Sequence, residues 1–540
     1  MSATQAPEAL PGLEAHIAVV GGSQLAEDYK AVNPAILSFY AGSPWSLGAF
    51  ERVAQQVRAS FTAERLQAMK AAIRAPTPES QAKLERIANG KGFFVSTGQQ
   101  AGLFGGPLYT IYKSLTALRL AEELERALGV PVAALFWTPS DDHDWDEVSH
   151  AVLLNAHNEL VEVRLGQPDD TPRSMAHRTI DASIDEVLQL VDAALPANEF
   201  ATQVIELLRD SYVPGRSISA AYRHLLEALF APMGMLFTDS AHPVVKQLSI
   251  PLLRHEFENT EQHTKLLRER TDQLLRAGYH EQVLVPEDAS NVMFEDEQGR
   301  ERLMRTDGEW QLRRTKRVLS HADVMQLLDT HPQHFSANVL LRPVQASWLF
   351  PTLAYIGGGA ELAYFGQIGG LFEAHNVPMP LVLPRFGVDL IERKVRKVLD
   401  KFELQPADLR RPFHELAAQI ARDDLPQRVV DGLARIRRDL TESYADLVDA
   451  TASIDPTLRG PLEGARNASH KQVDDVERKI LSHLKKRNEV ALEQLRKAAV
   501  HLYPNGARQE RVVNFAAYQA RYGPELIAAI YRCMELALTP

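Results

Sequence analysis

Cysteine is nearly absent from this sequence, since Cys533 is the single cysteine among 540 residues. A disulfide framework within the chain is therefore excluded, and so is a zinc site built from several thiolates. An excess of basic charge is also missing, because 59 Lys and Arg residues stand against 70 Asp and Glu residues, for a formal net charge of −11. General binders of nucleic acid or anionic membranes need a basic face, so we expect neither partner.

Long apolar runs are missing as well. No stretch approaches the roughly 20 apolar residues that span a bilayer. The first twenty residues carry Glu8 and Glu14 and lack the basic start of a secretory signal. With 45% hydrophobic and 24% charged residues, the composition is ordinary for a globular protein. We therefore expect a cytoplasmic enzyme with two or more domains and a sizeable buried core.

Short apolar runs alternate with helical patterns in the first part of the chain. Phe93–Val95 and Val132–Trp137 are predicted strands, and Tyr109–Leu128 between them is a predicted amphipathic helix. Strand, helix and strand in this order form a βαβ unit, which builds parallel sheets. Met235–Phe237 and Pro380–Leu383 are further predicted strands. The pattern predicts an α/β core over residues 1–388, with more helical insertions at about 165–335.

Helix-forming residues dominate the second part, residues 389–540. A 4-3 apolar spacing is followed by Val429, Leu433, Ile436, Leu440, Leu447 and Ala450. Asp455-Pro456 breaks this helix, and a second helix is predicted over about Pro461–Leu502. Two long helices joined by a short turn predict an antiparallel coiled-coil hairpin at about 427–502, followed by a C-terminal tail.

The first stretch with chemical potential is Ser96–Pro107, between the predicted strand at Phe94 and the helix from Tyr109. Its glycines let backbone N–H groups approach a ligand, and the following helix N-terminus favours negative charge. This fits a nucleotide phosphate or a substrate carboxylate, with Gln99 and Gln100 adding amide groups. The stretch matches neither a phosphate-binding P-loop nor a dinucleotide fingerprint, and a tight strand-to-helix turn explains it equally well.

The second stretch is Ser140–Glu147, which holds five acids around His143 and follows the predicted strand that ends at Trp137. Ligands of open α/β sheets bind at the carboxyl ends of strands. A crowded anionic field raises carboxylate pKa values and can hold a cation or a base. The possible roles are a general base toward an amine, a magnesium ligand, or a contact to a substrate ammonium or sugar hydroxyls. The alternative is a solvated acidic loop.

The third stretch runs from Leu341 to Arg385. Gly357–Gly359 precedes a predicted helix with Glu361 and Tyr364 on one face, again a ligand-site pattern. Arg342 and Arg385 could each bind a carboxylate or phosphate with both guanidinium nitrogens. Surface ion pairs are the alternative for the arginines, and a core position is the alternative for the tyrosine.

The fourth stretch, His501–Arg511, ends the second long helix with a Pro-Asn-Gly turn. A simple helix stop explains Pro504 and Gly506, but explains the polar, basic run after them less well. His150 and His157 are expected on a strand or loop surface and are not proposed as metal ligands.

Four blocks of the sequence resemble the signatures of one family, the bacillithiol biosynthesis cysteine-adding enzymes. They are TGQQAGLFGGPLYTIYKSLTALRLAEEL, FWTPSDDHDWDEVSHA, LRPVQASWLFPTLAYIGGGAELAYFGQIGGLFEAHNVPMPLVLPR and LYPNGARQERVVNF, and DYKAVNPAILSFYAG is similar as well. The blocks follow the family's order and spacing over nearly the full chain.

The resemblance implies a Rossmann-like core related to class I aminoacyl-tRNA synthetases and a coiled-coil domain that forms a homodimer. It implies a ligase that condenses cysteine with the amine of glucosaminyl malate, the last step to the thiol bacillithiol. TGQQAGLFGG takes the place of the synthetase HIGH signature, but Leu103, Phe104, Gly105 and Gly106 replace its residues, histidines included. Standard adenylate chemistry is therefore not implied. SDDHD is similar to the acidic turn that meets the amino-acid substrate in those synthetases.

The blocks and the resemblance together yield the candidate residues. Expected in catalysis are Asp142, His143, Asp144, Gln99 and Gln100. Expected in substrate binding are Thr97, Gly98, Asp146, Arg342, Gly358, Glu361, Tyr364 and Arg385. Expected in nucleotide binding are Tyr503, Asn505, Gly506, Arg508 and Arg511.

Activation of the cysteine carboxylate is expected because a free carboxylate does not condense with an amine at useful rates. An adenylate is the obvious form, so ATP or another adenine nucleotide is expected, either in the core or at the Tyr503–Arg511 turn. Two alternatives remain: a synthetase-like enzyme that activates another amino acid, and a non-enzymatic coiled-coil interaction protein.

Overall fold

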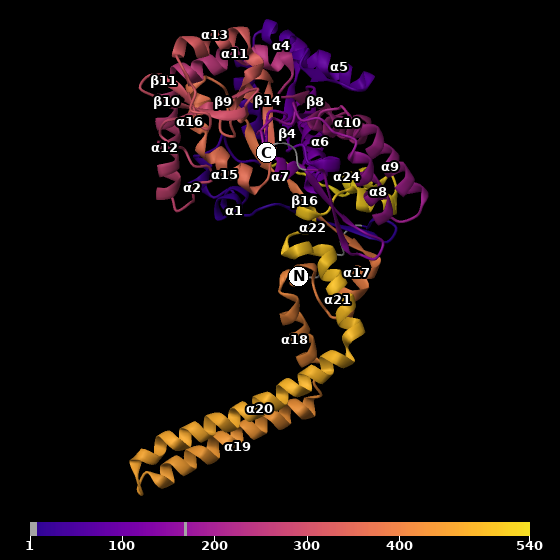
Figure 1. Ribbon diagram of the computed structural model, residues 1–540, viewed down its shortest axis with the longest axis vertical. Helices are drawn as coiled ribbons and strands as arrows, with labels where there is room; N and C mark the ends of the chain where they lie inside the picture. The colour runs from indigo at the N-terminus through magenta and orange to yellow at the C-terminus, as the bar shows by residue number, and fades with distance from the viewer. Residues whose placement is uncertain (1–7, 167–169) are drawn as a thin grey trace. The chain divides into compact units, whose positions relative to one another are not determined.

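The computed structural model describes residues 8–166 and 170–540, and the chain divides into two compact units (Figure 1). The first unit comprises Met1–Leu390 and Glu510–Pro540, and the second comprises Ile391–Gln509. The sequence grouped the tail with the helical segment from residue 389 onward, and that domain boundary stays a prediction; by its contacts, Glu510–Pro540 clusters with the first unit. Asn514 explains this placement, because its buried amide donates to the carbonyls of Phe104 (2.8 Å) and Gly106 (2.7 Å).

A six-stranded sheet forms the centre of the first unit. Its strands, in spatial order, are β15 (Leu381–Pro384), β14 (Thr352–Gly357), β4 (Phe93–Gly98), β5 (Val132–Thr138), β8 (Leu236–Asp239) and β3 (Ile73–Arg74). The first five are parallel to their neighbours, and β3 is antiparallel to β8. The four strands predicted from the sequence are β4, β5, β8 and β15. The Rossmann-like α/β class is therefore confirmed.

The crossover helix α6 (Tyr109–Leu128) coincides with the predicted helix and connects β4 to β5. Its length and its wide buried face follow from the apolar spacing of residues such as Ile111, Leu115 and Leu118. Gly98 ends β4 where a Cβ atom would lie 2.6 Å from the carbonyl oxygen of Trp137, so only glycine lets β4 and β5 approach here.

Strand order reverses at β4, which pairs with β5 on one side and with β14 on the other. The chain continues from β4 toward β5 and β8, and returns much later to add β14 and β15 at the opposite side. Such a reversal leaves a crevice outside the carboxyl ends of the strands, and this is where open α/β sheets bind ligands. The topology therefore points to the ends of β4 and β14.

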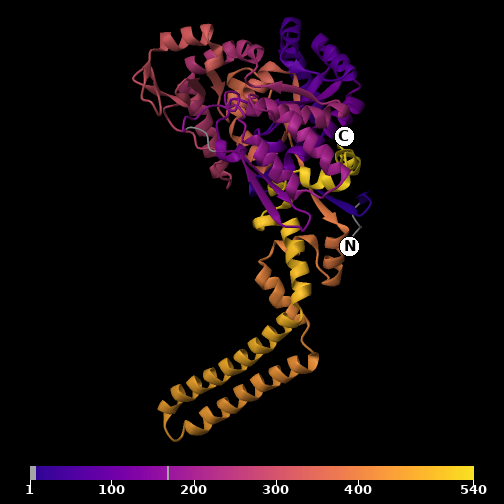
Figure 2. The same cartoon turned by 45° about the vertical axis from the view of Figure 1, so that its right-hand side comes forward.

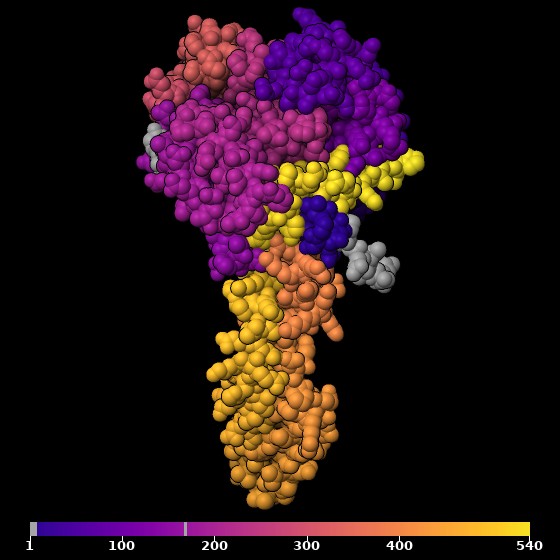
Figure 3. All heavy atoms as spheres, turned by 90° about the vertical axis from the view of Figure 1, so that its right-hand side faces the viewer, coloured from indigo at the N-terminus to yellow at the C-terminus, as the bar shows by residue number. Residues whose placement is uncertain are grey.

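Further helices and short strands surround this sheet in the first unit. They are β1 (Glu8–Leu10), β2 (Leu13–Val19), α1 (Gln24–Lys30), α2 (Pro34–Leu37), α3 (Leu47–Ser60), α4 (Ala63–Lys70), α5 (Pro78–Arg86), α7 (Trp145–Val148), and the hairpin of β6 (His150–Leu154) and β7 (Leu160–Arg164). The last elements are α14 (Arg342–Leu349), α15 (Gly359–Gln367), α16 (Gly369–Ala374), β16 (Phe386–Glu392), α22 (Gln509–Val512), α23 (Ala516–Tyr522) and α24 (Leu526–Cys533). In Figure 3 the yellow C-terminal segment lies beside the indigo N-terminal strand.

The region expected as insertions at about 165–335 is largely helical but includes the sheet strand β8. Its helices are α8 (Ile184–Ala194), α9 (Glu199–Ser211), α10 (Ile218–Phe230), α11 (Pro243–Glu258), α12 (Thr260–Arg276) and α13 (His321–Thr330). A second, antiparallel sheet has the order β12 (Val318–Leu319), β11 (Glu309–Leu312), β10 (Gly299–Thr306), β9 (Ala289–Asp296) and β13 (Phe335–Ala337). The strand predicted at Met235–Phe237 thus lies within this region as β8 and belongs to the central sheet.

The second unit contains two long helices that run side by side (Figure 2), α19 (Gln427–Thr451) and α20 (Arg459–Arg487). Arg437 of α19 pairs with Asp474 and Glu477 of α20, at 2.7 and 2.5 Å. The expected second helix does not continue to Leu502, because Asn488 separates α20 from α21 (Glu489–Leu502). The antiparallel hairpin is confirmed, but it ends at Arg487.

Helix α21 contributes instead to a small apolar cluster with α17 (Arg393–Lys401) and α18 (Phe413–Asp423). Leu399, Leu416, Leu495 and Leu502 are buried in it. In the part of the chain that the structure describes, no helix has the length and apolar character needed to cross a membrane.

Candidate functional site

A cavity of about 660 Å³ opens at the carboxyl ends of the parallel strands, where the strand order reverses. Each of the five parallel strands contributes residues at its carboxyl end or just after it. They are Gly98–Gln100 at the end of β4, Pro139 and Asp141–His143 after β5, Ser240 after β8, Gly358–Glu361 after β14, and Arg385 after β15. Further walls come from Arg300 and Arg302 of β10, Arg342 of α14 and Arg511 of α22. The whole lining belongs to the first unit.

Most of the residues expected from the sequence meet in this cavity. Its lining includes Gly98, Gln99, Gln100, Asp142, His143, Arg342, Gly358, Glu361, Tyr364, Arg385 and Arg511. Thr97, Asp144 and Asp146 do not line it. The other four expected nucleotide contacts, Tyr503, Asn505, Gly506 and Arg508, belong to the second unit.

The residues outside the lining have other local roles. Thr97 is fully buried, and its hydroxyl donates to the carbonyl of Ile356 at 3.2 Å, joining β4 to β14. Asp144 is exposed and caps α7, where its carboxylate accepts from the backbone N–H of Glu147 at 3.1 Å. Asp146 is exposed in the first turn of α7. Thr97 and Asp144 thus form structural hydrogen bonds next to the cavity, and their expected roles in binding and catalysis stay predictions.

The acidic turn after β5 is held by partners from three directions. Lys246 of α11 donates to Asp141 at 2.7 Å, and the side chain of Gln100 donates to Asp142. Arg300 lies 3.8 Å from Asp142 and 3.2 Å from Nδ1 of His143. An arginine has no acceptor, so Nδ1 of His143 accepts and the ring proton of the neutral tautomer is on Nε2. Burial and Arg300 lower the pKa of His143, which favours this neutral form.

Glu147 lines the cavity from α7, and its surroundings raise its pKa to about 7. Loss of hydration is the larger cause, and repulsion from Asp144 and Asp142 adds to it. Among the residues that the structure describes, no hydrogen bond or ion pair engages its carboxylate. A carboxylate with a pKa near the working pH and no partner is suited to accept a proton.

The glycine turn after β14 carries a buried ion pair. Glu361 accepts from Lys113 of α6 at 2.5 Å, from the backbone N–H of Gly358 at 2.8 Å, and from the hydroxyl of Tyr355. Burial raises the pKa of Glu361, but Lys113 and these hydrogen bonds outweigh it and leave a lowered pKa. Arg342 donates to the hydroxyl of Tyr364 at 2.7 Å. Glu361 is therefore a fixed anion on the cavity wall.

Arginines supply most of the positive charge of the cavity. Arg385 forms an ion pair with Glu510 through two hydrogen bonds of 2.9 Å. Both side chains are buried. In contrast, Arg302, Arg342 and Arg511 form no ion pair with any residue in the described parts of the chain. Guanidinium groups without a carboxylate partner, directed to one cavity, are suited to bind carboxylates or phosphates of a ligand.

Sequence reasoning missed several lining residues, chiefly Lys113, Glu147, Arg300 and Arg302. Lys113 left a signal, because a lysine stands in the middle of the buried face of a predicted helix, where an unpaired charge would be costly. Glu147 was part of the acidic run but had no assigned role. Arg300 and Arg302 gave no signal, since they reach the site from the separate sheet.

The residues at the place of the synthetase signature turn away from the cavity. Leu103 and Phe104 are buried, and none of Leu103–Gly106 belongs to the lining. Phe104 packs edge-on against Tyr212, with ring centroids 4.9 Å apart. This segment therefore supports the core and provides no side chain for phosphate chemistry.

The Tyr503 turn of the second unit has a left-handed backbone at Asn505 (φ 52°) and Gly506 (φ 77°). These residues are favoured at such positions, so the turn explains their presence without a ligand. Nucleotide binding there stays a prediction.

Comparison with known proteins agrees with this architecture. Residues 14–386 match the family described as "Bacillithiol biosynthesis BshC, N-terminal Rossmann-like domain", and residues 388–537 match its "C-terminal coiled-coil domain". A protein of Salinibacter ruber named "Putative cysteine ligase BshC" is 33% identical over 83% of this chain and 82% of its own length.

Two further relatives with the same name support the match. The one from Koribacter versatilis is 33% identical over 84% of this chain and 83% of its own, and the one from Bacillus cereus is 27% identical over 81% of each. The agreement covers both units, and the chain belongs to the BshC family of bacillithiol biosynthesis.

Proposed function

We propose that the chain is a cysteine ligase that forms an amide bond between cysteine and the amine of glucosaminyl malate, as the last step of bacillithiol biosynthesis. The observation that carries this proposal is the cavity at the strand ends, which is lined both by carboxylates and by three arginines that form no ion pair within the described residues. Family membership supports the ligation, since the relatives are named for it.

The charge distribution of the cavity fits this substrate. The malate part of glucosaminyl malate has two carboxylates, which Arg302, Arg342 and Arg511 can bind with paired N–H donors. Its sugar part has an amine, which carries a positive charge in water and suits the side of Asp141, Asp142 and Glu147. The lining thus offers groups of opposite charge to the two charged ends of one molecule.

Amide formation requires the amine nitrogen to attack an activated cysteine carbonyl carbon, to lose a proton, and to expel the activating group. Glu147 is the proposed acceptor of that proton, because its raised pKa leaves it partly ionised at neutral pH and no described residue forms a hydrogen bond or ion pair with its carboxylate. His143 was expected as a base, but Nδ1 is taken by Arg300. We assign it instead a donor role through Nε2, toward a substrate oxygen.

Glu361 and Gln100 are proposed to position the substrate. Glu361 is held by Lys113 and Tyr355, and Gln100 is held by Asp142, so both present fixed polar atoms to the lining. Fixed polar groups bind a substrate in one orientation without a large loss of side-chain entropy.

We propose that an adenine nucleotide activates the carboxyl group of cysteine. The arginines of the cavity could receive its phosphates, and Arg508 in the Tyr503 turn is the competing site. When bound, the nucleotide would supply a leaving group on the cysteine carboxyl.

Deletion of the gene tests the proposed reaction without any assumption about which nucleotide activates the cysteine. Bacillithiol, measured by thiol labelling and mass spectrometry, should disappear while glucosaminyl malate accumulates, and the wild-type gene should restore it. A gene with Glu147→Gln should restore little, whereas Glu159→Gln, on the exposed β6–β7 turn, should restore it fully. Unchanged bacillithiol in the deletion strain would refute the proposed reaction.

A further inference from the structure

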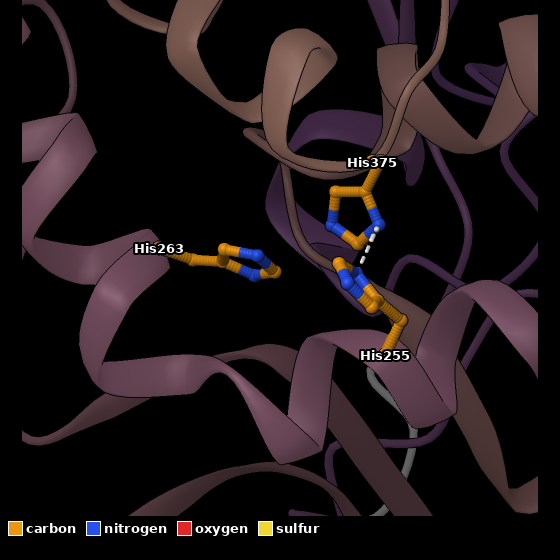
Figure 4. A group of neighbouring side chains, drawn as sticks. All are labelled: His255, His263 and His375. Carbon is orange, nitrogen blue, oxygen red and sulfur yellow. Dashed lines mark hydrogen bonds between the residues drawn. The ribbon is translucent and has the colours of Figure 1, made fainter.

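Three histidines that are distant in the sequence meet in the first unit, apart from the cavity lining. They are His255 of α11, His263 of α12 and His375 at the end of α16, and their rings face a common space (Figure 4). One ring nitrogen of each histidine lies within 4.8 Å of one from both others. His263 and His375 are buried and His255 is partly exposed, so solvent can reach the group from one side.

Glu256 determines which ring nitrogens are available. Its fully buried carboxylate lies 2.7 Å from Nδ1 of His263 and 3.0 Å from Nε2 of His375. A carboxylate accepts, so both of these nitrogens carry protons. In the neutral rings, Nε2 of His263 and Nδ1 of His375 then have free lone pairs. A carboxylate behind the histidine is the usual outer partner of metal-binding imidazoles.

The spacing of the remaining nitrogens is that of a ligand pair. Nδ1 of His255 lies 3.2 Å from Nδ1 of His375, and without an ion the two share a hydrogen bond in which the lone pair of His375 accepts (dashed in Figure 4). In a tetrahedral site with metal–nitrogen distances of about 2.0–2.1 Å, two ligating nitrogens are about 3.3 Å apart. Rotation of the His263 ring toward this pair would complete three corners of a tetrahedron, and the exposed side of His255 leaves the fourth corner to water.

The charge of the group also favours a cation. Glu256 is fully buried, and in the described parts of the chain its only ion-pair partners are His263 and His375. Asn291 donates to its other oxygen at 2.8 Å but brings no charge. A buried carboxylate without a compensating cation is costly. A divalent ion held by three neutral imidazoles would balance it.

We propose that His255, His263 and His375 bind one divalent transition-metal ion of the kind that prefers imidazole ligands, with Glu256 as the outer carboxylate. The ion would fix α11, α12 and the end of α16 to one another. Glu256, Asn291 and Asn338 form a hydrogen-bonded row, since Asn338 donates to Asn291 at 2.9 Å, and Asn338 lines the cavity. The ion would therefore stabilise one wall of the site without contacting the substrate.

Zinc titration of the full-length chain tests this site. After treatment with a chelator and its removal, the wild-type protein should take up one Zn²⁺ per chain, measured by calorimetry and elemental analysis, and its melting temperature should rise. Cobalt in place of zinc should give the visible absorption of a tetrahedral nitrogen site. Absence of stoichiometric zinc uptake by the wild type would overturn the proposal, whatever the variants do.

Variants locate the ion. His263→Gln and Glu256→Gln should weaken zinc binding at least tenfold, and His255→Gln, at the partly exposed position, does the same with less risk to folding. His157→Gln, in an exposed turn, is the matched control and should bind as the wild type does. Equal affinity of His255→Gln and the wild type would place any bound zinc elsewhere and contradict the assignment. Both readouts are independent of ligase activity.

Discussion

Lys113 and Glu361 join the two elements that flank the reversal of strand order, with Nζ 2.5 Å from the nearer carboxylate oxygen. Lys113 belongs to α6, which follows β4, and Glu361 belongs to α15, which follows β14. Lys113 also donates to the carbonyl of Gly98 at 2.7 Å. One ammonium group thus connects α6, the end of β4 and α15 next to the cavity. The ion pair is thus a structural part of the site.

Glu361→Gln removes the charge that compensates buried Lys113. We expect this variant to lower the free energy of unfolding of the first unit by about 2–4 kcal/mol, somewhat less than for a fully enclosed pair because Glu361 keeps 21% of its side chain exposed. Urea denaturation measures the effect. Glu123→Gln breaks a pair with Arg126, whose side chain is 74% exposed, and should cost much less stability. Equal losses in both variants would contradict a special role of the buried pair.

Glu147 leads to a pH prediction. Its folded-state pKa of about 7 is raised above the ordinary value of 4.5, so it gains its charge only as the pH rises toward and past 7. A base must be ionised, and we expect kcat/KM for amide formation to fall below about pH 7 in the wild type. In Glu147→Gln the rate should be low at every pH and should not show this fall below pH 7.

The same shift affects stability with a defined sign. A carboxyl group that binds its proton more tightly when folded favours the folded state below pH 4.5, and this contribution disappears between pH 4.5 and about 7. Carboxyl carbon resonances of Glu147, assigned by comparison with Glu147→Gln, measure the pKa directly. A midpoint near 4.5 in the folded protein would exclude it as the base.

Arg342 should bind a carboxylate of glucosaminyl malate. We expect Arg342→Lys to weaken binding at least tenfold by calorimetry, because a lysine cannot replace the paired donors of a guanidinium group. Arg276→Gln, at the exposed end of α12, should leave the affinity unchanged. If Arg342→Lys binds as the wild type does, the substrate carboxylates lie elsewhere in the cavity.

The sequence identified the strand-end segments because local patterns determine them. Gly98–Gln100 and Asp142 lie at or after the ends of predicted strands, whereas Gly358–Glu361 were found by their glycine turn and the strand before them, β14, was not predicted. Parallel strands bring their ends together. Arg300 and the histidines around Glu256 could not be found in this way. They come from separate elements whose proximity depends on packing of the whole unit, and no spacing in the chain encodes it.

Arg508 and Arg511 are predicted to act together at one nucleotide site, and separate substitutions measure what each contributes. If an adenine nucleotide binds at the Tyr503 turn, Arg508→Ala should weaken ADP and ATP binding at least tenfold and Arg342→Lys should not. If it binds in the cavity, Arg342→Lys and Arg511→Ala should both weaken nucleotide binding, and Arg508→Ala should not. Calorimetry that detects no nucleotide binding by the wild type would remove both sites.

The homodimer remains a prediction, and the surface of the hairpin indicates how to test it. Ile436 and Leu447, which belong to the 4-3 apolar spacing of α19, are 47% and 48% exposed, and Val476 of α20 is 51% exposed. Burial of such apolar residues drives helix association. A second copy that covers this surface would bury them. Light scattering at micromolar concentration should therefore give twice the 60.2 kDa chain mass.

Charged substitutions in the hairpin should break this association. We expect Ile436→Glu combined with Val476→Glu to give a monomer, because two buried carboxylates would face an apolar surface without partners. Leu190→Glu is the control, since Leu190 is 56% exposed in the first unit and should leave the dimer intact. A dimer that survives the hairpin variant would mean that another surface holds the copies together, and a monomeric wild type would show that the exposed apolar residues serve a different contact.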